Sequence, residues 1–289
     1  MAAEHETAQA VAEATGHAAE AAHGAHGGAF DPATTIFHHL LDSQTLELPF
    51  IGEVHLPTLH LGSWNLPITK HVVMMWVASL IVIMVAGIAA RRRAMVPGRV
   101  QSLVEMLVLF VRDELARKNI GHGGDRYVPF LLTAFFFILG CNFLGLVPYG
   151  ATATSNIGVT ATLAGLTFIM TQAAGIRENG FFGYIHSIVP PGIPAWLLPI
   201  MIPVEIIGLF TKPFALAVRL FANMFAGHAI IMALICLVFI LKSVLVGFFL
   251  TVPFALFISG IELMVAFLQA FIFTMLSSLF IGMSAHPSH

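Results

Sequence analysis

The sequence predicts an all-α polytopic membrane protein with about five membrane-embedded helices. Hydrophobic residues make up 58% of the 289 residues and charged residues only 10%, whereas soluble domains average about 25% charged residues. Several apolar runs also reach the roughly 20 residues that a helix needs to cross the hydrocarbon core of a bilayer. The two cysteines, Cys141 and Cys236, lie in such runs, and we interpret them as small core residues.

Residues 1–69 have a different composition and are expected to form an external N-terminal segment. No Lys or Arg precedes Lys70, whereas eight of the fifteen acidic residues and eight of the fourteen histidines do. This composition is wrong for a nucleic-acid-binding arm or a mitochondrial transit peptide, and residues 1–30 contain no signal-peptide core. For residues 1–30 we favour a solvated, partly disordered tail over a His-rich metal-binding tract.

Residues 70–289 form the predicted membrane domain. Its first span covers about residues 72–90 and is followed directly by Arg91, Arg92 and Arg93. A basic cluster after a span marks the cytoplasmic side. The N-terminus is therefore expected outside, with the chain entering the cell through this span.

The stretch at about residues 99–118 (RVQSLVEMLVLFVRDELARK) is amphipathic. Its apolar residues share one helical face, and its charged residues interrupt the run elsewhere. This pattern predicts a helix that lies in the cytoplasmic interface of the membrane. A buried cytoplasmic helix is the alternative.

Two further spans follow, at about residues 129–148 and 157–175. A short external link, YGATATSN, joins them, and Arg177 follows the second of them on the side assigned to the cytoplasm. The polar residues in this region, Asn142, Ser155 and Asn156, are interpreted as hydrogen-bonding contacts that hold helices together.

The last two apolar segments, at about residues 196–241 and 244–283, are too long for ordinary spans. At 1.5 Å per residue the first would be about 70 Å long, against a hydrocarbon core of about 30 Å. Either the first segment is two spans with a buried turn, or it is one long, strongly tilted helix. We favour two long tilted helices that form a hairpin, with the C-terminus in the cytoplasm.

Ionisable residues interrupt the first of these long segments. Glu205, Lys212 and Arg219 are seven residues apart, and Asn223 lies one turn beyond Arg219. Residues seven apart lie on nearly the same helical face. Arginine keeps its charge in a protein, and a charge in the bilayer core is costly. Arg219 must therefore face a carboxylate or a watery cavity.

The second long segment contains Glu262 and Gln269, also seven residues apart. His228 and Glu262 lie on consecutive antiparallel segments at similar expected depth. Burial and neighbours can bring the pKa values of both residue types towards neutrality, which is what a proton path requires. A structural hydrogen bond between the two is the alternative.

Several functional classes lack their motifs in this sequence. It contains no Walker loop, no HExxH metal site and no GxSxG nucleophile motif. Only His228 lies deep in an expected span, which argues against a haem with two histidine ligands. We therefore expect no cofactor, no metal site, no nucleic-acid partner and no covalent catalysis by this chain alone.

The polar segments resemble subunit a of the F-type ATP synthase, the membrane stator that faces the rotating ring of c subunits. The resemblance rests on TKPFALAVRLFANMFAGH and IELMVAFLQAFIFTML, with support from NFLGLVP and TATSNIGVTATLA. It covers about residue 72 to the C-terminus. Residues 1–65 match no common part of the family.

The resemblance implies roles for individual residues. Arg219 matches the family's essential arginine, and Gln269 matches the glutamine that faces it. His228 and Glu262 match a pair whose identities are exchanged between members. The remaining matches are polar residues of the arginine helix, Asn223 near the arginine and Glu205 and Lys212 on its cytoplasmic half. Asn156 is a departure, because some members carry an acidic residue in the outer link.

The resemblance also implies a mechanism and partners. Protons enter by an outer half-channel, protonate a carboxylate of the c ring and leave by a cytoplasmic half-channel. Arg219 separates the two channels. The partners are the c ring, the b subunit of the peripheral stalk, the rest of the ATP synthase and the lipid bilayer. We favour a bacterial inner membrane over the mitochondrial one, and H⁺ and Na⁺ both remain open as the ion.

Two rival functions remain on the sequence alone. A secondary transporter also places charged residues near the bilayer midplane, but we find no internal repeat that joins the two halves of the chain. A structural scaffold would tolerate apolar replacements at Arg219, His228 and Glu262.

Overall fold

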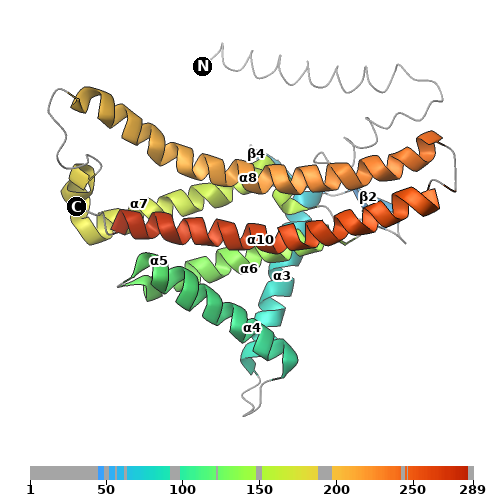
Figure 1. Ribbon diagram of the computed structural model, residues 1–289, viewed down its shortest axis with the longest axis horizontal. Coiled ribbons are helices and arrows are strands. Elements are labelled where there is room, and N and C mark those ends of the chain that lie inside the picture. Colours follow the sequence, from blue (N-terminus) through green and yellow to red (C-terminus); the bar gives the residue numbers. More distant parts are fainter. Residues whose placement is uncertain are drawn as a thin grey trace.

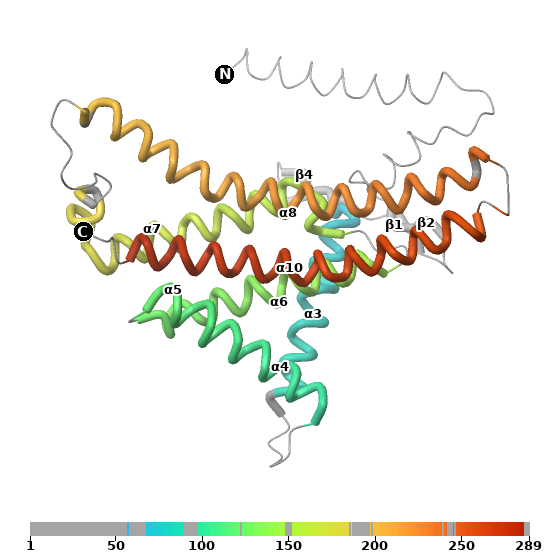
Figure 2. Tube along the Cα trace, viewed as in Figure 1, coloured from blue at the N-terminus to red at the C-terminus, as the bar shows by residue number. Residues whose placement is uncertain are grey.

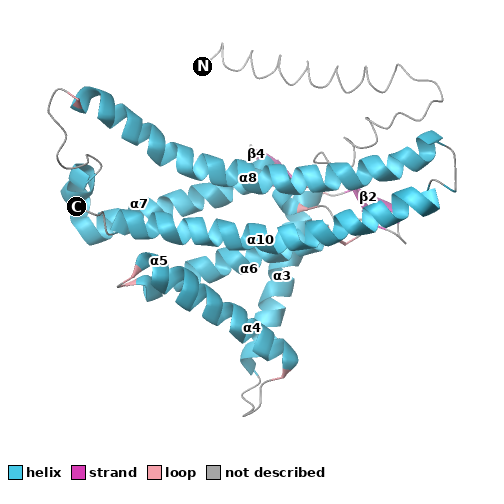
Figure 3. Cartoon of the chain, viewed as in Figure 1, coloured by secondary structure: helices cyan, strands magenta, loops and turns pink. Residues whose placement is uncertain are grey.

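The computed structural model describes residues 45–48, 52–55, 57–61, 64–91, 98–121, 123–147, 152–187, 197–241, 245 and 247–285. Within these residues five helices are long and apolar enough to cross a membrane. This finding confirms the predicted all-α membrane fold, whose helices dominate Figure 3. The tail expected at residues 1–30 lies outside the described residues.

Two short antiparallel hairpins precede the first helix. Strand β1 (Thr45–Leu48) pairs with β2 (Gly52–His55), and β3 (Thr58–Leu61) pairs with β4 (Trp64–Pro67). The sequence analysis assigned no strands here. The alternation of threonine or acidic residues with leucine in TLEL is the short period-two signal that such a strand leaves.

Helix α3 (Lys70–Arg91) lies across the long helices in Figure 1 and packs against α6. Most of its large apolar side chains are exposed, among them Trp76, Leu80 and Ile83. An apolar helix with so little contact to its own chain needs lipid or another apolar partner around it.

The predicted amphipathic helix is one continuous helix of three parts: α4 (Arg99–Leu109), a π-helical stretch η1 (Phe110–Arg117) and α5 (Lys118–Ile120). No residue of α4 is buried, whereas η1 buries Val111, Leu115 and Ala116 against α6 and α10. The two halves therefore differ in environment, and only α4 presents an uncovered apolar face.

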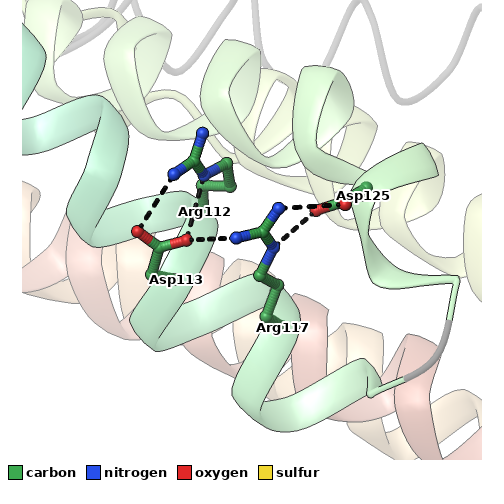
Figure 4. Close-up of polar contacts among 4 residues, drawn as sticks. All are labelled: Arg112, Asp113, Arg117 and Asp125. Atoms are coloured by element: carbon green, nitrogen blue, oxygen red, sulfur yellow. Dashed lines mark hydrogen bonds and ion pairs between the residues drawn. The ribbon is translucent and has the colours of Figure 1, made fainter.

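The helix from α4 to α5 ends in a cluster of charged residues (Figure 4). The Arg117 guanidinium bridges Asp113 and Asp125, with its Nε 2.8 Å from Asp125 Oδ1, and Arg112 also contacts Asp113. A hydrogen bond from Arg112 lowers the pKa of Asp113, and one from Arg117 lowers the pKa of Asp125. Asp125 lies in the short 3-10 turn η2 (Gly124–Arg126). The cluster thus ties this turn to the end of the amphipathic helix.

Helices α6 (Val128–Gly145) and α7 (Ile157–Ser187) are connected through the short 3-10 helix η3 (Ala153–Ser155). Helix α7 extends beyond the span expected at residues 157–175 and continues through Arg177. It is interrupted at Gly180, whose φ of 70° is outside the helical region. A basic residue after a span indicates its orientation rather than the end of the helix.

Helices α8 (Leu198–Leu241) and α10 (Val252–Ala285) form the predicted hairpin, and the π-helical turn η4 (Gly247–Thr251) leads into α10. The two run antiparallel and side by side (Figures 1 and 2). The 44 residues of α8 form one helix, about 66 Å long at 1.5 Å per residue. A helix of this length fits a core of about 30 Å only if it is strongly tilted.

The core lies where α6, α7, α8 and α10 meet. Its largest buried side chains include Leu131 and Phe135 from α6, Leu220 from α8 and Phe273 from α10. Helix α10 packs against all three other helices. This position places its polar residues, Glu262 and Gln269, inside the bundle.

Candidate functional site

The closest contact between two ionisable residues within the bundle joins α8 to α10. Nδ1 of His228 lies 2.6 Å from Oε1 of Glu262, and the side chain of Glu262 is 3% exposed. Such a buried carboxylate is costly as an isolated charge. The contact between His228 and Glu262 therefore determines which of the two side chains carries a proton.

The other ring nitrogen of His228 faces the link between α6 and α7. Its Nε2 is 2.9 Å from the carbonyl oxygen of Gly145 and 2.8 Å from Oγ1 of Thr152. A carbonyl oxygen can only accept, so Nε2 carries a proton when it bonds to Gly145. The contact with Glu262 must then contain a second proton, held either by Nδ1 or by the carboxyl group. The pair can therefore hold this proton on either partner.

A glycine makes room for this contact. A Cβ added at Gly227 would lie 2.9 Å from Oε1 and 3.1 Å from Cδ of Glu262. Gly145 has a similar role on the other side, because a Cβ there would clash with the side chain of Thr152. Both backbones can therefore approach the pair closely, as small residues in membrane helices allow.

A second set of buried polar groups lies next to the pair. Oδ1 of Asn142 accepts a hydrogen bond of 2.6 Å from Oγ1 of Thr154, and its Nδ2 donates to the carbonyl oxygen of Ala266, 3.2 Å away. Ala266 is one helical turn beyond Glu262. The side chains of Asn142 and Thr154 are fully buried. Buried polar groups therefore extend from His228 through η3 to Asn142.

Arg219 lies on the outer surface of α8, as does Asn223. Leu220 and Met224, on the opposite face, are buried in the bundle. No hydrogen bond or ion pair joins Arg219 to another residue that the structure describes. The chain thus presents a permanent cation on the surface of a helix whose other exposed side chains are largely apolar.

Gln269 was expected to face the arginine. It is buried on α10, and no hydrogen bond between it and Arg219 occurs in the described part of the chain. The helix hairpin therefore brings His228 and Glu262 together, but gives Arg219 no polar partner among the described residues.

Glu205 and Lys212 face a different space. Both are half-buried and line a cavity of about 130 Å³ between α7, α8 and α10, together with Gln172 and Ser284. Nζ of Lys212 lies 5.8 Å from the ring centre of Phe280. The spacing of seven suggested one shared face with Arg219, but an α-helix drifts by about 20° per heptad. Over the one heptad from Lys212 and the two heptads from Glu205 to Arg219 this drift is about 20° and 40°. Packing also contributes, because residues of α7 and α10 cover the part of α8 that carries Glu205 and Lys212.

The sequence analysis missed Gly145, Thr152 and Thr154 as members of the site and treated Asn142 only as a structural contact. Nothing in their spacing reveals their positions, because they meet His228 through the fold of the α6–α7 link. In the residues that the structure describes, no group of three or more His, Cys, Asp or Glu side chains could hold a metal ion.

Comparisons with known proteins agree on one family. A family model described as "ATP synthase A chain" matches residues 72–282. The chain is 51% identical to "ATP synthase subunit a 2" of Prosthecochloris aestuarii, over 98% of this chain and 88% of the relative. It is 50% identical to "ATP synthase subunit a" of Chlorobium phaeobacteroides, over 96% and 83%. It is 54% identical to that of Myxococcus xanthus, over 81% and 78%.

Proposed function

This chain belongs to the ATP synthase A chain family, and from this premise we propose how its own side chains conduct protons. It is a multi-pass bacterial membrane subunit of the F-type ATP synthase and serves as the proton-channel stator of the membrane sector. We infer that the proton path runs through His228 and Glu262, and that Arg219 separates entry from exit.

Entry begins at the His228–Glu262 pair. A proton that arrives along the buried polar groups of η3 and Asn142 is taken up at Nε2 of His228 while this nitrogen is unprotonated and accepts from Thr152. Nδ1 then gives its proton to Glu262, which passes it on, because the two groups lie 2.6 Å apart. Two groups that exchange a proton at hydrogen-bond distance meet the geometric requirement for proton transfer.

The receiving group is a carboxylate of the neighbouring c ring. Once protonated, this group is neutral and can turn into lipid, whereas its ionised form would be costly there. Each elementary charge that crosses 100 mV makes about 2.3 kcal/mol available. A ring that collects several charges therefore supplies the energy for one ATP.

Arg219 acts on the ring carboxylate by its fixed charge. Its exposed position on α8 is the observation that carries the proposal, because a lone cation on an apolar helix requires a partner from outside the chain. The guanidinium attracts each ionised carboxylate that passes and repels protons that would otherwise leak between the half-channels.

Exit uses the cavity lined by Glu205 and Lys212. A carboxylate and an ammonium group beside a small polar cavity can pass a proton through water. Asn223 and Gln269 complete the surroundings of the ring carboxylate. The basic residues after α3 support an orientation with the C-terminus in the cytoplasm. In this proposal the b subunit of the peripheral stalk holds the chain against rotation.

The test is ATP-driven proton pumping by the whole complex in inverted membrane vesicles. Arg219→Ala should abolish pumping while the complex still assembles, because the exposed arginine makes no hydrogen bond or ion pair with the described residues of the chain. Val218→Ala, an exposed neighbour on the same helix, is the matched control and should pump normally. Normal pumping by Arg219→Ala would refute the role.

A further inference from the structure

The cavity that contains Glu205 and Lys212 has a further polar wall, formed by the end of α7. Gln172 and Tyr184 both line it, and the hydroxyl of Tyr184 donates a hydrogen bond to Oε1 of Gln172. The two residues are 12 positions apart in the sequence, which corresponds to about 18 Å along a straight helix at 1.5 Å per residue. Their contact therefore requires that α7 does not continue straight.

Gly180 supplies the change of direction. Its φ of 70° and ψ of 163° lie outside the helical region, in a conformation that residues other than glycine rarely adopt. Figure 1 shows the last part of α7 turned out of line with the rest of the helix. The ring of Tyr184 lies against the backbone of Gly175, where an added Cβ would clash with it. The segment after Gly180 is thus folded back, and it brings the Tyr184 hydroxyl to Gln172.

The end of α10 fixes this wall from the other side. Nδ2 of Asn179 donates to the carbonyl oxygens of Ser284 and Ala285, at 3.2 and 3.3 Å. The hydroxyl of Ser284 donates to the carbonyl oxygen of Thr171, 2.9 Å away. Contacts between two helices therefore hold the residues around Gln172, as a precisely placed functional group requires.

The amide nitrogen of Gln172 is not used by these contacts. The bond from Tyr184 occupies the amide oxygen, and Nε2 is buried without a hydrogen-bond partner in the described part of the chain. A buried donor that lacks an acceptor is costly. The amide therefore needs an acceptor from the cavity that Gln172 lines.

Glu205 offers such an acceptor. It is the one acidic residue among the described residues that line the cavity, where the other titratable groups are Lys212 and Tyr184. No hydrogen bond or ion pair joins Glu205 to another residue that the structure describes. The volume of about 130 Å³ has room for several waters. A donor and a carboxylate thus border one small space in which water can connect them.

We propose that Gln172, held in place by Tyr184, is a positioning residue for Glu205, and that its Nε2 hydrogen-bonds through water to the ionised carboxylate. The inference rests on the proton exit through Glu205 proposed above. A proton that leaves the ring carboxyl group passes through water to Glu205 and from there to the cytoplasm, and the amide keeps both of its own hydrogens. A hydrogen bond to the ionised form favours that form. Gln172 therefore helps Glu205 to release each proton, and in the pumping direction it holds the carboxylate in place for uptake.

The test is ATP-driven pumping by the whole complex in inverted membrane vesicles, measured in H₂O and in D₂O. Gln172→Leu retains a side chain of similar size but removes the donor. It should lower the pumping rate several-fold and raise the ratio of the rate in H₂O to the rate in D₂O, because proton transfer in the cavity then limits the rate. Tyr184→Phe should change both quantities in the same direction but less, since the amide remains. A merely structural role would reduce the number of active complexes and leave the ratio unchanged.

Two substitutions outside the cavity are the matched controls. Tyr127→Phe removes a buried hydroxyl that has no hydrogen-bond partner among the described residues, and Gln101→Leu replaces a half-buried glutamine of α4. Both should leave the rate and the isotope ratio unchanged. The addition of Gln172→Leu to Glu205→Gln should cause no further loss, because Gln172 acts through the carboxylate of Glu205.

Three results would overturn the proposal. Full pumping by Gln172→Leu together with slow pumping by Glu205→Gln would leave the exit path intact and exclude Gln172 from it. Slow pumping by Gln172→Leu with an unchanged isotope ratio would assign the residue a structural role only. Full pumping by Glu205→Gln would refute the exit path itself, and the role of Gln172 with it.

Discussion

If His228 and Glu262 hold one proton between them, substitution of one residue and exchange of both should have different effects on proton flux. Glu262→Gln or His228→Ala removes one partner of a contact of 2.6 Å. A buried group left without its partner costs about 1–3 kcal/mol. If this cost falls on the proton-transfer step, the rate falls by about 5–150-fold.

The exchanged pair should recover most of this loss. In the double variant His228→Glu with Glu262→His, a carboxyl group and an imidazole again face each other between α8 and α10. Gly227 leaves space beside residue 262, so the larger imidazole can be accommodated there. The proton can again be held by either partner, and we expect the double variant to exceed both single variants at least several-fold.

The assay is proton flux through reconstituted complexes, measured both as ATP-driven pumping and as ATP synthesis driven by an imposed gradient. Thermal unfolding of each purified complex separates a loss of flux from a loss of assembly. Single variants that retain full proton flux would refute proton transfer through His228 and Glu262. A double variant that carries no more protons than the single variants, although its complex is intact, would contradict this reasoning. The rate would then depend on which residue occupies which position, not on a proton that either partner can hold.

Three further predictions concern packing and charge. Gly227→Ala should lower the stability of the complex in thermal unfolding by about 1–3 kcal/mol through overpacking, because its Cβ would lie 2.9 Å from the Glu262 carboxylate. Gly208→Ala is the control and should be neutral, because a Cβ there meets nothing within 4 Å. Asn142→Ala should lower stability in the same measurement by about 1–3 kcal/mol, since it leaves the buried hydroxyl of Thr154 without its acceptor. The pKa of Asp125 is lowered below its ordinary value of 3.8, so the stabilisation of its turn is present above that pH and is lost as the pH falls through the lower folded-state value. Hydrogen exchange of the turn, corrected for intrinsic rates, should show this loss in the native chain and no such dependence in Arg117→Ala.

The membrane helices could be predicted from the sequence because apolar length and period leave direct signals. Five helices long enough to span occur where the apolar runs lie. The choice of long helices over two spans with a turn was correct for α8, which continues through Pro203 and Pro213. The short hairpins before α3 were missed, because strands of four residues give too few alternations to be distinguished from a loop.

Within the site, the sequence could indicate which residue types matter but not how they meet. The equal expected depth of His228 and Glu262 was enough to pair them. The contacts of Nε2 with Gly145 and Thr152 depend on the path of the α6–α7 link, and a carbonyl oxygen leaves no signal in a sequence. Lys212 and Arg219 also differ in exposure more than their spacing suggested, because α7 and α10 cover the part of α8 that carries Lys212 and leave Arg219 at the surface.

We propose that the exposed face of α8 that carries Arg219 lies against the c ring. The most direct test is an oxidative cross-link in native membranes between Asn223→Cys and a cysteine placed beside the ring carboxylate. Cys141 and Cys236 are buried, so background reaction should be low. The account predicts a cross-link in high yield from Asn223→Cys and none from Met224→Cys, which faces the bundle. A cross-link from Met224→Cys alone, or from neither position in an assembled complex, would contradict it.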